Sequence, residues 1–405
     1  MVSQTSENPK CSLVDLYSGP GGLSLGFQQS GYFQPVVAVE KNNNTAETYE
    51  NNLNIKVIRK KVENINTNDL LKYSYKSGYD SIDVLIGGPP CRPFTTANKG
   101  STRWDKIKKK NYDGNENVEH PDWYNFWKIV DSLKPKIIVA ENVLGLKYYT
   151  DVVNTFNKRL SSSGYNTINR VLDAQYFGVP QKRNRLFIVG LLNYNKDINS
   201  LLPNNPPDYK IKKVTVKEAI GDLPELTNSS PGSKISNYHK GRPTKYQSMI
   251  RNGNTILFDH IVHSVHPIMV KRFQYIPQGY NLRKALSEGK ISEYILKLKY
   301  KKGNSERSFS DKTLSNIHSN IYRRLKWKDV SYTITHVRKT VLIHPLQNRL
   351  LSIREAARLQ SFPDWFRFSG SLSQQYQQIA DAVPPLLAKT IASHINNFLD
   401  EHNKY

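Results

Sequence analysis

The chain has 405 residues, enough for two or three domains, and its 38% hydrophobic and 11% aromatic content supports a buried core. Lys and Arg number 58 against 34 Asp and Glu, and the resulting charge of +24 indicates a polyanionic partner such as nucleic acid. A mean hydropathy of −0.59 and the lack of an apolar run near 20 residues exclude a membrane span. Two cysteines with a polar Met1–Lys10 segment predict a cytoplasmic protein without a signal peptide.

The first 190 residues alternate between strand and helix patterns. Short apolar runs that end in turn residues predict strands, and amphipathic runs between them predict helices. The expected strands are 12–17, 35–40, 82–86, 137–140, 167–172 and 186–191, and the expected helices are 23–30, 45–52 and 123–133. This alternation predicts an α/β fold with a largely parallel sheet and helices on both faces.

The pattern changes after residue 191. A polar stretch rich in Pro and Asn over 193–207 is typical of a linker, and a short helix is expected over 214–223. From about 225 to 340 helix and strand signals are weak and turns are many. Helices return over 353–360 and 383–399, so we expect one α/β domain that is split by an inserted domain.

The expected insertion is also the most basic part of the chain. Residues 227–340 contain 22 Lys and Arg against 6 Asp and Glu, a net charge of +16. Aromatic residues are interleaved with these cations. This mixture of basic and aromatic side chains with Gly and Asn turns is typical of a loop-rich nucleic-acid surface.

The first strand leads into a glycine-rich turn, Gly19-Pro20-Gly21-Gly22. Such a turn lets the backbone approach a ligand at the start of the next helix. Glu40 ends the second strand about 20 residues later, where an acid binds ribose hydroxyls. The two features indicate a nucleoside cofactor, the alternative being a structural turn. No phosphate-binding loop with Lys and Ser or Thr follows, which favours a nucleoside without a triphosphate.

Cys91 lies on a Pro-Pro corner just after the apolar strand 82–86. The carboxyl ends of strands are where open α/β sheets build their sites, so this thiol is a candidate nucleophile. A lone cysteine can also be a small buried hydrophobic residue. Cys11 is the only other cysteine, which excludes a disulfide or metal framework.

Three charged residues at strand ends are further candidates. Glu141 follows the apolar strand 137–140, where a carboxyl group near a dry pocket can hold a proton; the alternative is a solvated loop acid. Arg183 and Arg185 are two residues apart, so on an extended chain both point to one side and can grip a phosphate or a carbonyl. The alternative is a charged strand entry.

His260, His263 and His266 lack a nearby Cys, so we expect phosphate contacts or packing there and no metal site.

Six motifs lie in order from residue 12 to about residue 395. They are Asp15-Leu16-Tyr17-Ser18-Gly19-Pro20-Gly21-Gly22, Gly88-Pro89-Pro90-Cys91, Glu141-Asn142-Val143, Gln181-Lys182-Arg183-Asn184-Arg185, Arg354-Glu355-Ala356-Ala357-Arg358-Leu359-Gln360-Ser361-Phe362-Pro363-Asp364 and Ala382-Val383-Pro384-Pro385. In the residues of these motifs and in their order the chain resembles the DNA cytosine carbon-5 methyltransferases of the bacterial restriction–modification type. One such motif is weak evidence, whereas six in the family's order leave little room for chance.

The resemblance implies a fold and a domain organisation. It implies a Rossmann-like, S-adenosylmethionine-dependent methyltransferase domain over 10–224. An irregular, basic target-recognition domain would occupy 225–345, and a C-terminal segment over 346–405 would return to the catalytic domain. The family's variable domain falls between the Gln181 and Arg354 motifs, where the basic insertion was placed from its composition.

The resemblance also implies roles for the candidate residues. Cys91 would add to carbon 6 of cytosine, which makes carbon 5 nucleophilic. Glu141 would hydrogen-bond ring nitrogen 3 and the exocyclic amine, while Arg185 and Arg183 would hold the ring carbonyl and a nearby phosphate. S-adenosyl-L-methionine would supply the methyl group. Its expected binding residues are Tyr17, near the adenine, Glu40, at the ribose, and Ser18, Gly19, Gly21, Gly22, Lys41, Glu63, Asn64, Pro89, Asp381 and Ala382.

Double-stranded DNA is the implied substrate, with the target cytosine flipped out of the helix. The polar segment 92–119 resembles the family's loop that closes over the flipped base. Lys106 to Lys110 would contact DNA phosphates. A monomer and a companion restriction endonuclease are expected. The chain departs from the family at Arg92, where Gln is common, and at Ala380-Asp381, where Gly-Asn is usual. Rival functions are methylation of structured RNA and DNA binding without catalysis.

Overall fold

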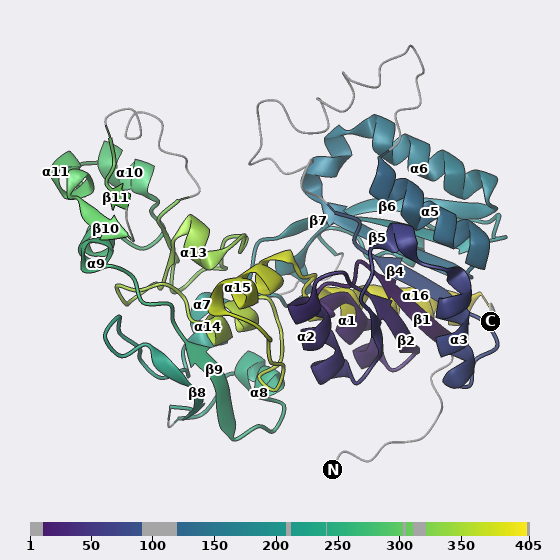
Figure 1. Ribbon diagram of the computed structural model, residues 1–405, viewed down its shortest axis with the longest axis horizontal. Helices are drawn as coiled ribbons and strands as arrows, with labels where there is room; N and C mark the ends of the chain where they lie inside the picture. Colours follow the sequence, from purple (N-terminus) through teal and green to yellow (C-terminus); the bar gives the residue numbers. More distant parts are fainter. Residues whose placement is uncertain are drawn as a thin grey trace. The chain divides into compact units, whose positions relative to one another are not determined.

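The computed structural model describes residues 11–90, 120–207, 212–239, 241–302, 305–310 and 321–402. The chain folds into two compact units (Figure 1). The first unit consists of Met1–Phe177, Arg183–Ile211 and Val383–Tyr405, and the second of Gly178–Lys182 and Lys212–Ala382. No helix in the described part of the chain is long and apolar enough to cross a membrane.

A sheet of seven strands, counted over the described residues, forms the centre of the first unit. Its strand order is β3-β2-β1-β4-β5-β7-β6. The strands are β1 (Cys11–Leu16), β2 (Phe33–Val39), β3 (Val57–Ile58), β4 (Val84–Gly87), β5 (Ile137–Val143), β6 (Tyr165–Asp173) and β7 (Asn184–Leu192). β1 to β5 run parallel, whereas β7 is antiparallel to both of its neighbours, β5 and β6. The predicted α/β fold with a largely parallel sheet is therefore confirmed, with β7 as the reversed strand.

Helices cover both faces of this sheet because its strands are apolar on both sides. Val14 and Leu16 of β1 join the core cluster that also contains Phe126 and Phe156. The intervening Asp15 bonds to the first helix on the other face. The helices are α1 (Gly22–Ser30), α2 (Asn43–Leu53), α3 (Thr67–Lys76), α5 (Pro121–Leu133), α6 (Thr150–Ser162) and α16 (Pro385–Glu401). α1 packs against α16, and α5 lies beside α6 (Figure 1).

Among the described residues of this unit, two helices and one strand were not expected from the sequence. β3 has only two residues, too few for a periodic signal. α3 starts with a polar turn, and α6 has no side-chain cap. The buried Val152, Phe156 and Leu160 of α6 are spaced four residues apart, which is the pattern that could have revealed this helix.

The contact between α1 and α16 depends on Gly26. A Cβ atom at this position would lie 2.4 Å from the Cβ of Ala388 and 2.4 Å from the carbonyl oxygen of Pro385. The second of these atoms belongs to a helix backbone and cannot move aside by a side-chain rotation. The C-terminal helix can therefore pack on the first helix only because residue 26 has no side chain.

We expect Gly26→Ala to lower the free energy of unfolding by about 1–3 kcal/mol, since the two helices must move apart to admit the methyl group. Urea denaturation followed by circular dichroism measures this change. Gln29→Ala, at an exposed position of the same helix, is the matched control. Equal stability of the Gly26→Ala and Gln29→Ala variants would show that the helices separate without cost.

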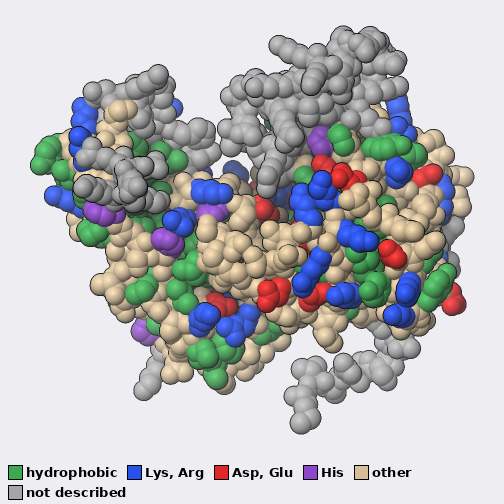
Figure 2. Space-filling view, viewed as in Figure 1, with side chains coloured by type: hydrophobic (Ala, Val, Ile, Leu, Met, Phe, Trp, Pro, Cys, Tyr) green, Lys and Arg blue, Asp and Glu red, His purple; other side chains and the backbone are tan. Residues whose placement is uncertain are grey.

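The second unit consists of short elements. Its helices are α7 (Val216–Ile220), α8 (Lys245–Arg251), α9 (Pro267–Gln274), α10 (Leu282–Ser287), α11 (Glu293–Lys297), α13 (Val337–Thr340), α14 (Ile353–Leu359) and α15 (Leu372–Asp381). Its strands form pairs: β8 (Gly232–Asn237) with β9 (Ile256–Ile261), β10 (Tyr300–Lys302) with β11 (Ser305–Arg307), and β12 (Arg323–Arg324) with β13 (Leu342–Ile343). On the face in Figure 2, Lys and Arg side chains are scattered and have acidic side chains between them.

A buried ionic cluster holds these short elements together. Arg358 of α14 pairs through Nε and Nη2 with the carboxylate of Asp364 at 2.9 and 2.7 Å. Through Nη1 and Nη2 it also pairs with the carboxylate of Asp222, which follows α7. Arg354 donates to the carbonyl oxygens of Phe258, Pro363 and Phe366. The motif around Arg354 is thus buried and joins segments far apart in the sequence.

This cluster explains where the compact units divide. We expected the inserted domain to span 225–345, whereas the second unit extends from Lys212 to Ala382. Arg358 bonds Asp222 and the carbonyl oxygen of Ala219, which brings α7 and α14 into the same unit. Sequence composition identifies only the basic segment. The hydrogen bonds of Arg358 extend the compact unit beyond that segment toward both the N-terminus and the C-terminus.

Candidate functional site

The turn after β1 has an unusual backbone. Tyr17, Gly19 and Gly21 have φ angles of +55°, +55° and +96°, a left-handed region that favours glycine. A Cβ on Gly21 would lie 2.8 Å from Cδ2 of Tyr49, so the turn closes tightly over α2. Nothing lies within 4 Å of the corresponding point on Gly19. A ligand can therefore approach the backbone at Gly19.

Glu40 joins this turn to the end of β2. Its Oε2 accepts from the backbone N–H of Gly19 at 3.2 Å, and its Oε1 accepts from that of Asn42 at 2.7 Å. Burial raises the pKa of this carboxyl group, although the two backbone N–H groups oppose the shift. The side chain is thus held beside the glycine turn, where its carboxylate can accept hydrogen bonds from the hydroxyl groups of a ribose.

Two further features fit an anionic or polar ligand at this turn. The Oγ of Ser18 is buried and has no hydrogen-bond partner among the described residues. α1 begins at Gly22, and no described side chain caps its N-terminus. Uncapped backbone N–H groups at a helix start attract a carboxylate. The residues present therefore fit the expected S-adenosyl-L-methionine, since Ser18 and the start of α1 offer polar groups to its carboxylate.

Tyr17 lies beside this turn and is anchored by its hydroxyl group, which donates to the carbonyl oxygen of Asp122 at 3.1 Å. Burial raises the pKa of Tyr17, and the carboxylates of Asp122 and Glu63 add to the shift. Glu63 itself is exposed and pairs with Lys61 at 3.0 Å. Lys41 and Asn64, which were also expected to bind the cofactor, are exposed.

A buried chain of hydroxyl groups lies beneath the turn. The Tyr49 hydroxyl donates to Ser24 Oγ at 2.7 Å, and Ser24 Oγ donates to Asp15 Oδ2 at 2.6 Å. These side chains belong to α2, α1 and β1. Burial raises the pKa of Asp15 to about 8. Ser24 and Tyr49 were not predicted from the sequence, since no spacing rule relates these three positions.

Asp15→Asn tests this assignment through the pH dependence of stability. Asp15 stays protonated in the folded protein up to a pH of about 8, whereas the unfolded chain releases the proton near its ordinary pKa of 3.8. Its contribution to stability is therefore complete below about pH 4 and is lost as the pH rises to about 8, by up to about 1.4 kcal/mol per pH unit. Asparagine cannot ionise, so we expect the variant to gain stability relative to wild type across this range.

Urea denaturation at pH 5, 6.5 and 8 measures the difference between the two proteins. Asp80→Asn, at an exposed position of the same unit, controls for the removal of a carboxylate. A constant difference between the Asp15→Asn variant and wild type at all pH values would show that Asp15 is ionised in the folded protein.

Glu141 and Arg185 meet at the carboxyl end of β5. The Nε of Arg185 lies 2.9 Å from Oε1 of Glu141, and both side chains are largely buried. The antiparallel register of β5 and β7 pairs Val143 with Arg185, which brings the two side chains together.

The end of β4 lies next to this pair. A Cβ on Gly88 would be 3.2 Å from Oε2 of Glu141, so the second carboxylate oxygen faces the turn after β4. Nδ2 of Asn142 donates to the carbonyl oxygen of Pro89 at 2.8 Å and fixes that turn. Pro89 is buried. Cys91 follows two residues later and lies outside the described residues, as do Arg92, Lys106 to Lys110 and the remainder of the 92–119 segment.

Arg183 does not share the environment of Arg185. Its side chain is fully buried, and its backbone N–H donates to Oδ1 of Asp173 at 3.0 Å. Asp173 thereby closes the connection between β6 and β7. Asp381 ends α15 in the second unit and accepts from Gln377 at 2.8 Å, and Ala382 is the buried last residue of that unit.

The three histidines have separate partners. The ring nitrogens of His260 bond to Ser352 Oγ at 3.0 Å and to the carbonyl oxygen of Pro224 at 2.8 Å. His263 bonds the carbonyl oxygen of Ser264, and His266 caps α9. In the part of the chain that is described, no group of three His, Cys, Asp or Glu side chains could hold a metal ion.

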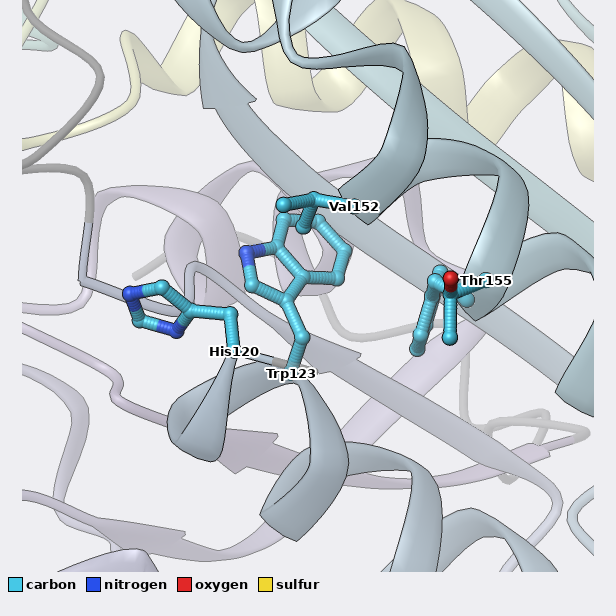
Figure 3. Close-up of a pocket in the computed structure, with 5 residues that line it drawn as sticks. His120, Trp123, Val152 and Thr155 are labelled. Carbon is cyan, nitrogen blue, oxygen red and sulfur yellow. The ribbon is translucent and has the colours of Figure 1, made fainter. Parts of the chain in front are cut away.

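A small cavity lies between α5 and α6 (Figure 3). His120, Trp123, Val152, Thr155 and Phe156 line it, and no predicted site residue is among them. Nε1 of Trp123 is buried without a hydrogen-bond partner among the described residues. The lining residues of this cavity include no residue of the turn after β1 and neither Glu141 nor Arg185, so the cavity is not part of the candidate site.

Comparison with known proteins shows the family of the chain. The model of one protein family, C-5 cytosine-specific DNA methylase, matches residues 11–397. The type II methyltransferase M.DdeI of Desulfomicrobium norvegicum is 30% identical, with 97% of this chain and 90% of the relative covered. M.AgeI of Thalassovita gelatinovora is 29% identical, with 94% and 98% covered.

Two solved structures share the fold. One is an Escherichia coli prophage protein assigned as a DNA modification methyltransferase, with a TM-score of 0.71 at 24% identity over 96% of this chain and 99% of the other. The second is the Dnmt2 methyltransferase of S. pombe, with a TM-score of 0.52 at 15% identity over 97% and 99%.

Proposed function

The chain belongs to the C-5 cytosine-specific DNA methylases, whose methyl donor is S-adenosyl-L-methionine, and from this premise we propose that it is a sequence-specific type II DNA (cytosine-5)-methyltransferase of a bacterial restriction–modification system. The relatives M.DdeI and M.AgeI are named type II methyltransferases and are covered over 90% and 98% of their lengths. The substrate is double-stranded DNA, and a companion endonuclease cuts the same site when it is unmethylated.

The observation that supports this function best is the Glu141–Arg185 pair beside the turn after β4. A carboxyl group and a guanidinium on one sheet edge suit a cytosine ring, because the ring offers nitrogen 3 and the amine to an acid and the carbonyl to a donor. Cys91 comes two residues after Pro89, whose carbonyl oxygen Asn142 holds. The turn after β1, with Gly19 and Gly21, lies at the same carboxyl edge of the sheet, because β1, β4 and β5 run parallel.

In the proposed reaction the thiolate of Cys91 adds to carbon 6 of a cytosine flipped out of the duplex. The ring electrons move toward nitrogen 3, where the proton of Glu141 compensates the new charge, and carbon 5 becomes nucleophilic. Bound S-adenosyl-L-methionine supplies an electrophilic methyl group for carbon 5. Loss of the carbon-5 proton to water then restores the double bond and expels the Cys91 thiolate.

The remaining parts of the chain have proposed roles in DNA binding. The basic segment within 225–345 recognises the target sequence, because its cations neutralise phosphates and its many loops can enter the major groove. Arg183 supports the connection that holds Arg185, and Asp381 and Ala382 stay predicted cofactor-binding residues. The enzyme acts as a monomer in the cytoplasm.

Bisulfite sequencing of DNA from a host that expresses the protein tests the function directly. Protected cytosines should occur at one short sequence and should be missing from a host with the empty vector. A duplex with 5-fluorocytosine at that position should trap the protein covalently when S-adenosyl-L-methionine is present, because fluorine cannot leave as a proton does. Methylation of RNA but not DNA would overturn the proposal.

A further inference from the structure

The segment that follows Glu141 is a short 3-10 helix, η4 (Leu144–Tyr148), between β5 and α6. Loops in this position, at the carboxyl end of a parallel strand, commonly contact substrates in α/β proteins. η4 packs against β7 and α6, and its Leu146 is fully buried in the core of the first unit. η4 is therefore held in a fixed position next to the strand end that bears Glu141.

The last two residues of η4 point to solvent. Lys147 is exposed, and the Tyr148 side chain is 68% exposed, which is high for an aromatic residue. Nζ of Lys147 lies 5.2 Å from the centre of the Tyr148 ring. Neither side chain has a hydrogen bond or an ion pair with any described residue. A cation and an open aromatic face are thus presented together.

We propose that Lys147 and Tyr148 form a DNA contact beside the target cytosine, with the Tyr148 ring packed on a flanking nucleotide and Lys147 at a phosphate. This inference rests on the proposed function, since DNA must cover the sheet edge where Glu141 and Arg185 lie. Aromatic faces stack on any base, and lysine ammonium groups pair with phosphates. The contact is therefore expected to add affinity without adding sequence preference.

The same unit offers a matched control pair in α3. Tyr75 is 57% exposed, and Lys76, the exposed last residue of α3, follows it. In the sequence α3 follows β3 and precedes β4. Its C-terminal end therefore lies at the amino edge of the parallel sheet, where β4 begins. Tyr75 and Lys76 thus present similar side chains at the edge opposite to Glu141. Their replacement removes the same chemistry from the protein without touching the proposed DNA surface.

Fluorescence anisotropy with a duplex that contains the methylation site measures the effect on DNA affinity. We expect Tyr148→Ala to weaken DNA binding about tenfold or more and Tyr148→Phe to leave it near wild type, because the ring remains. Lys147→Ala should reduce the slope of log affinity against log salt by about 1. Tyr75→Ala and Lys76→Ala should behave as wild type. Calorimetric binding of S-adenosyl-L-methionine should be the same for all variants, which shows that the folded cofactor site is intact.

The outcomes separate this inference from the proposed function. If wild type methylates DNA while Tyr148→Ala and Lys147→Ala bind DNA as tightly as the α3 variants, the contact is wrong and the function stands. If wild type binds DNA without methylating it and Tyr148→Ala still weakens binding, the contact stands and the function is wrong. Equal losses in the α3 and η4 variants would overturn the contact, because the effect would then reflect general charge or surface loss.

Discussion

Cys91→Ser is expected to lower the rate of methyl transfer by about 10⁴-fold or more while DNA binding remains at the wild-type level. The step that activates the ring needs a thiolate that adds to carbon 6 and later leaves. A serine hydroxyl group is not ionised near neutral pH, so it provides neither the nucleophile nor the leaving group of the thiolate. Transfer of a tritiated methyl group from S-adenosyl-L-methionine to duplex DNA measures the rate.

Cys11→Ala is the matched control for Cys91→Ser. Cys11 is the other cysteine of the chain and lies buried in β1, away from the strand ends that form the site. This variant should keep its methyl transfer activity, with stability reduced only by the smaller side chain. Activity in the Cys91→Ser protein comparable to that of the control would remove Cys91 from the reaction.

Glu141→Gln is expected to lower kcat by about 10²- to 10⁴-fold with little change in the affinity for S-adenosyl-L-methionine. The amide keeps the size of the side chain, and its oxygen can still accept from Nε of Arg185, which lies 2.9 Å from the carboxylate. It cannot transfer a proton to ring nitrogen 3, so the charge that arrives there is no longer compensated. Single-turnover methyl transfer and calorimetric cofactor binding separate the two quantities.

Glu47→Gln, at an exposed position on α2, controls for the loss of one carboxylate from the first unit. Thermal unfolding of both variants shows whether the buried pair with Arg185 also contributes to stability. An unchanged kcat with weakened cofactor binding in Glu141→Gln would assign Glu141 a structural role at the end of β5.

The sequence was sufficient for features that depend on neighbouring residues. Short apolar runs bounded by turn residues predicted the strands β1, β2, β4 and β5 within a few residues, because such runs reflect local burial. The glycines at 19 and 21 predicted the turn after β1, since a left-handed backbone needs such residues. Glu141 could be placed at a strand end for the same local reason.

Tertiary structure decided which of these local pieces meet. β7 enters the sheet between β5 and β6 in the reverse direction, and this register brings Arg185 to Glu141 while Arg183 is fully buried. The bonds from Tyr49 through Ser24 to Asp15 join three elements in the same way. Strand order and such contacts depend on the free energy of packing distant segments into one core, and periodicity within a single segment contains no information about its distant partner.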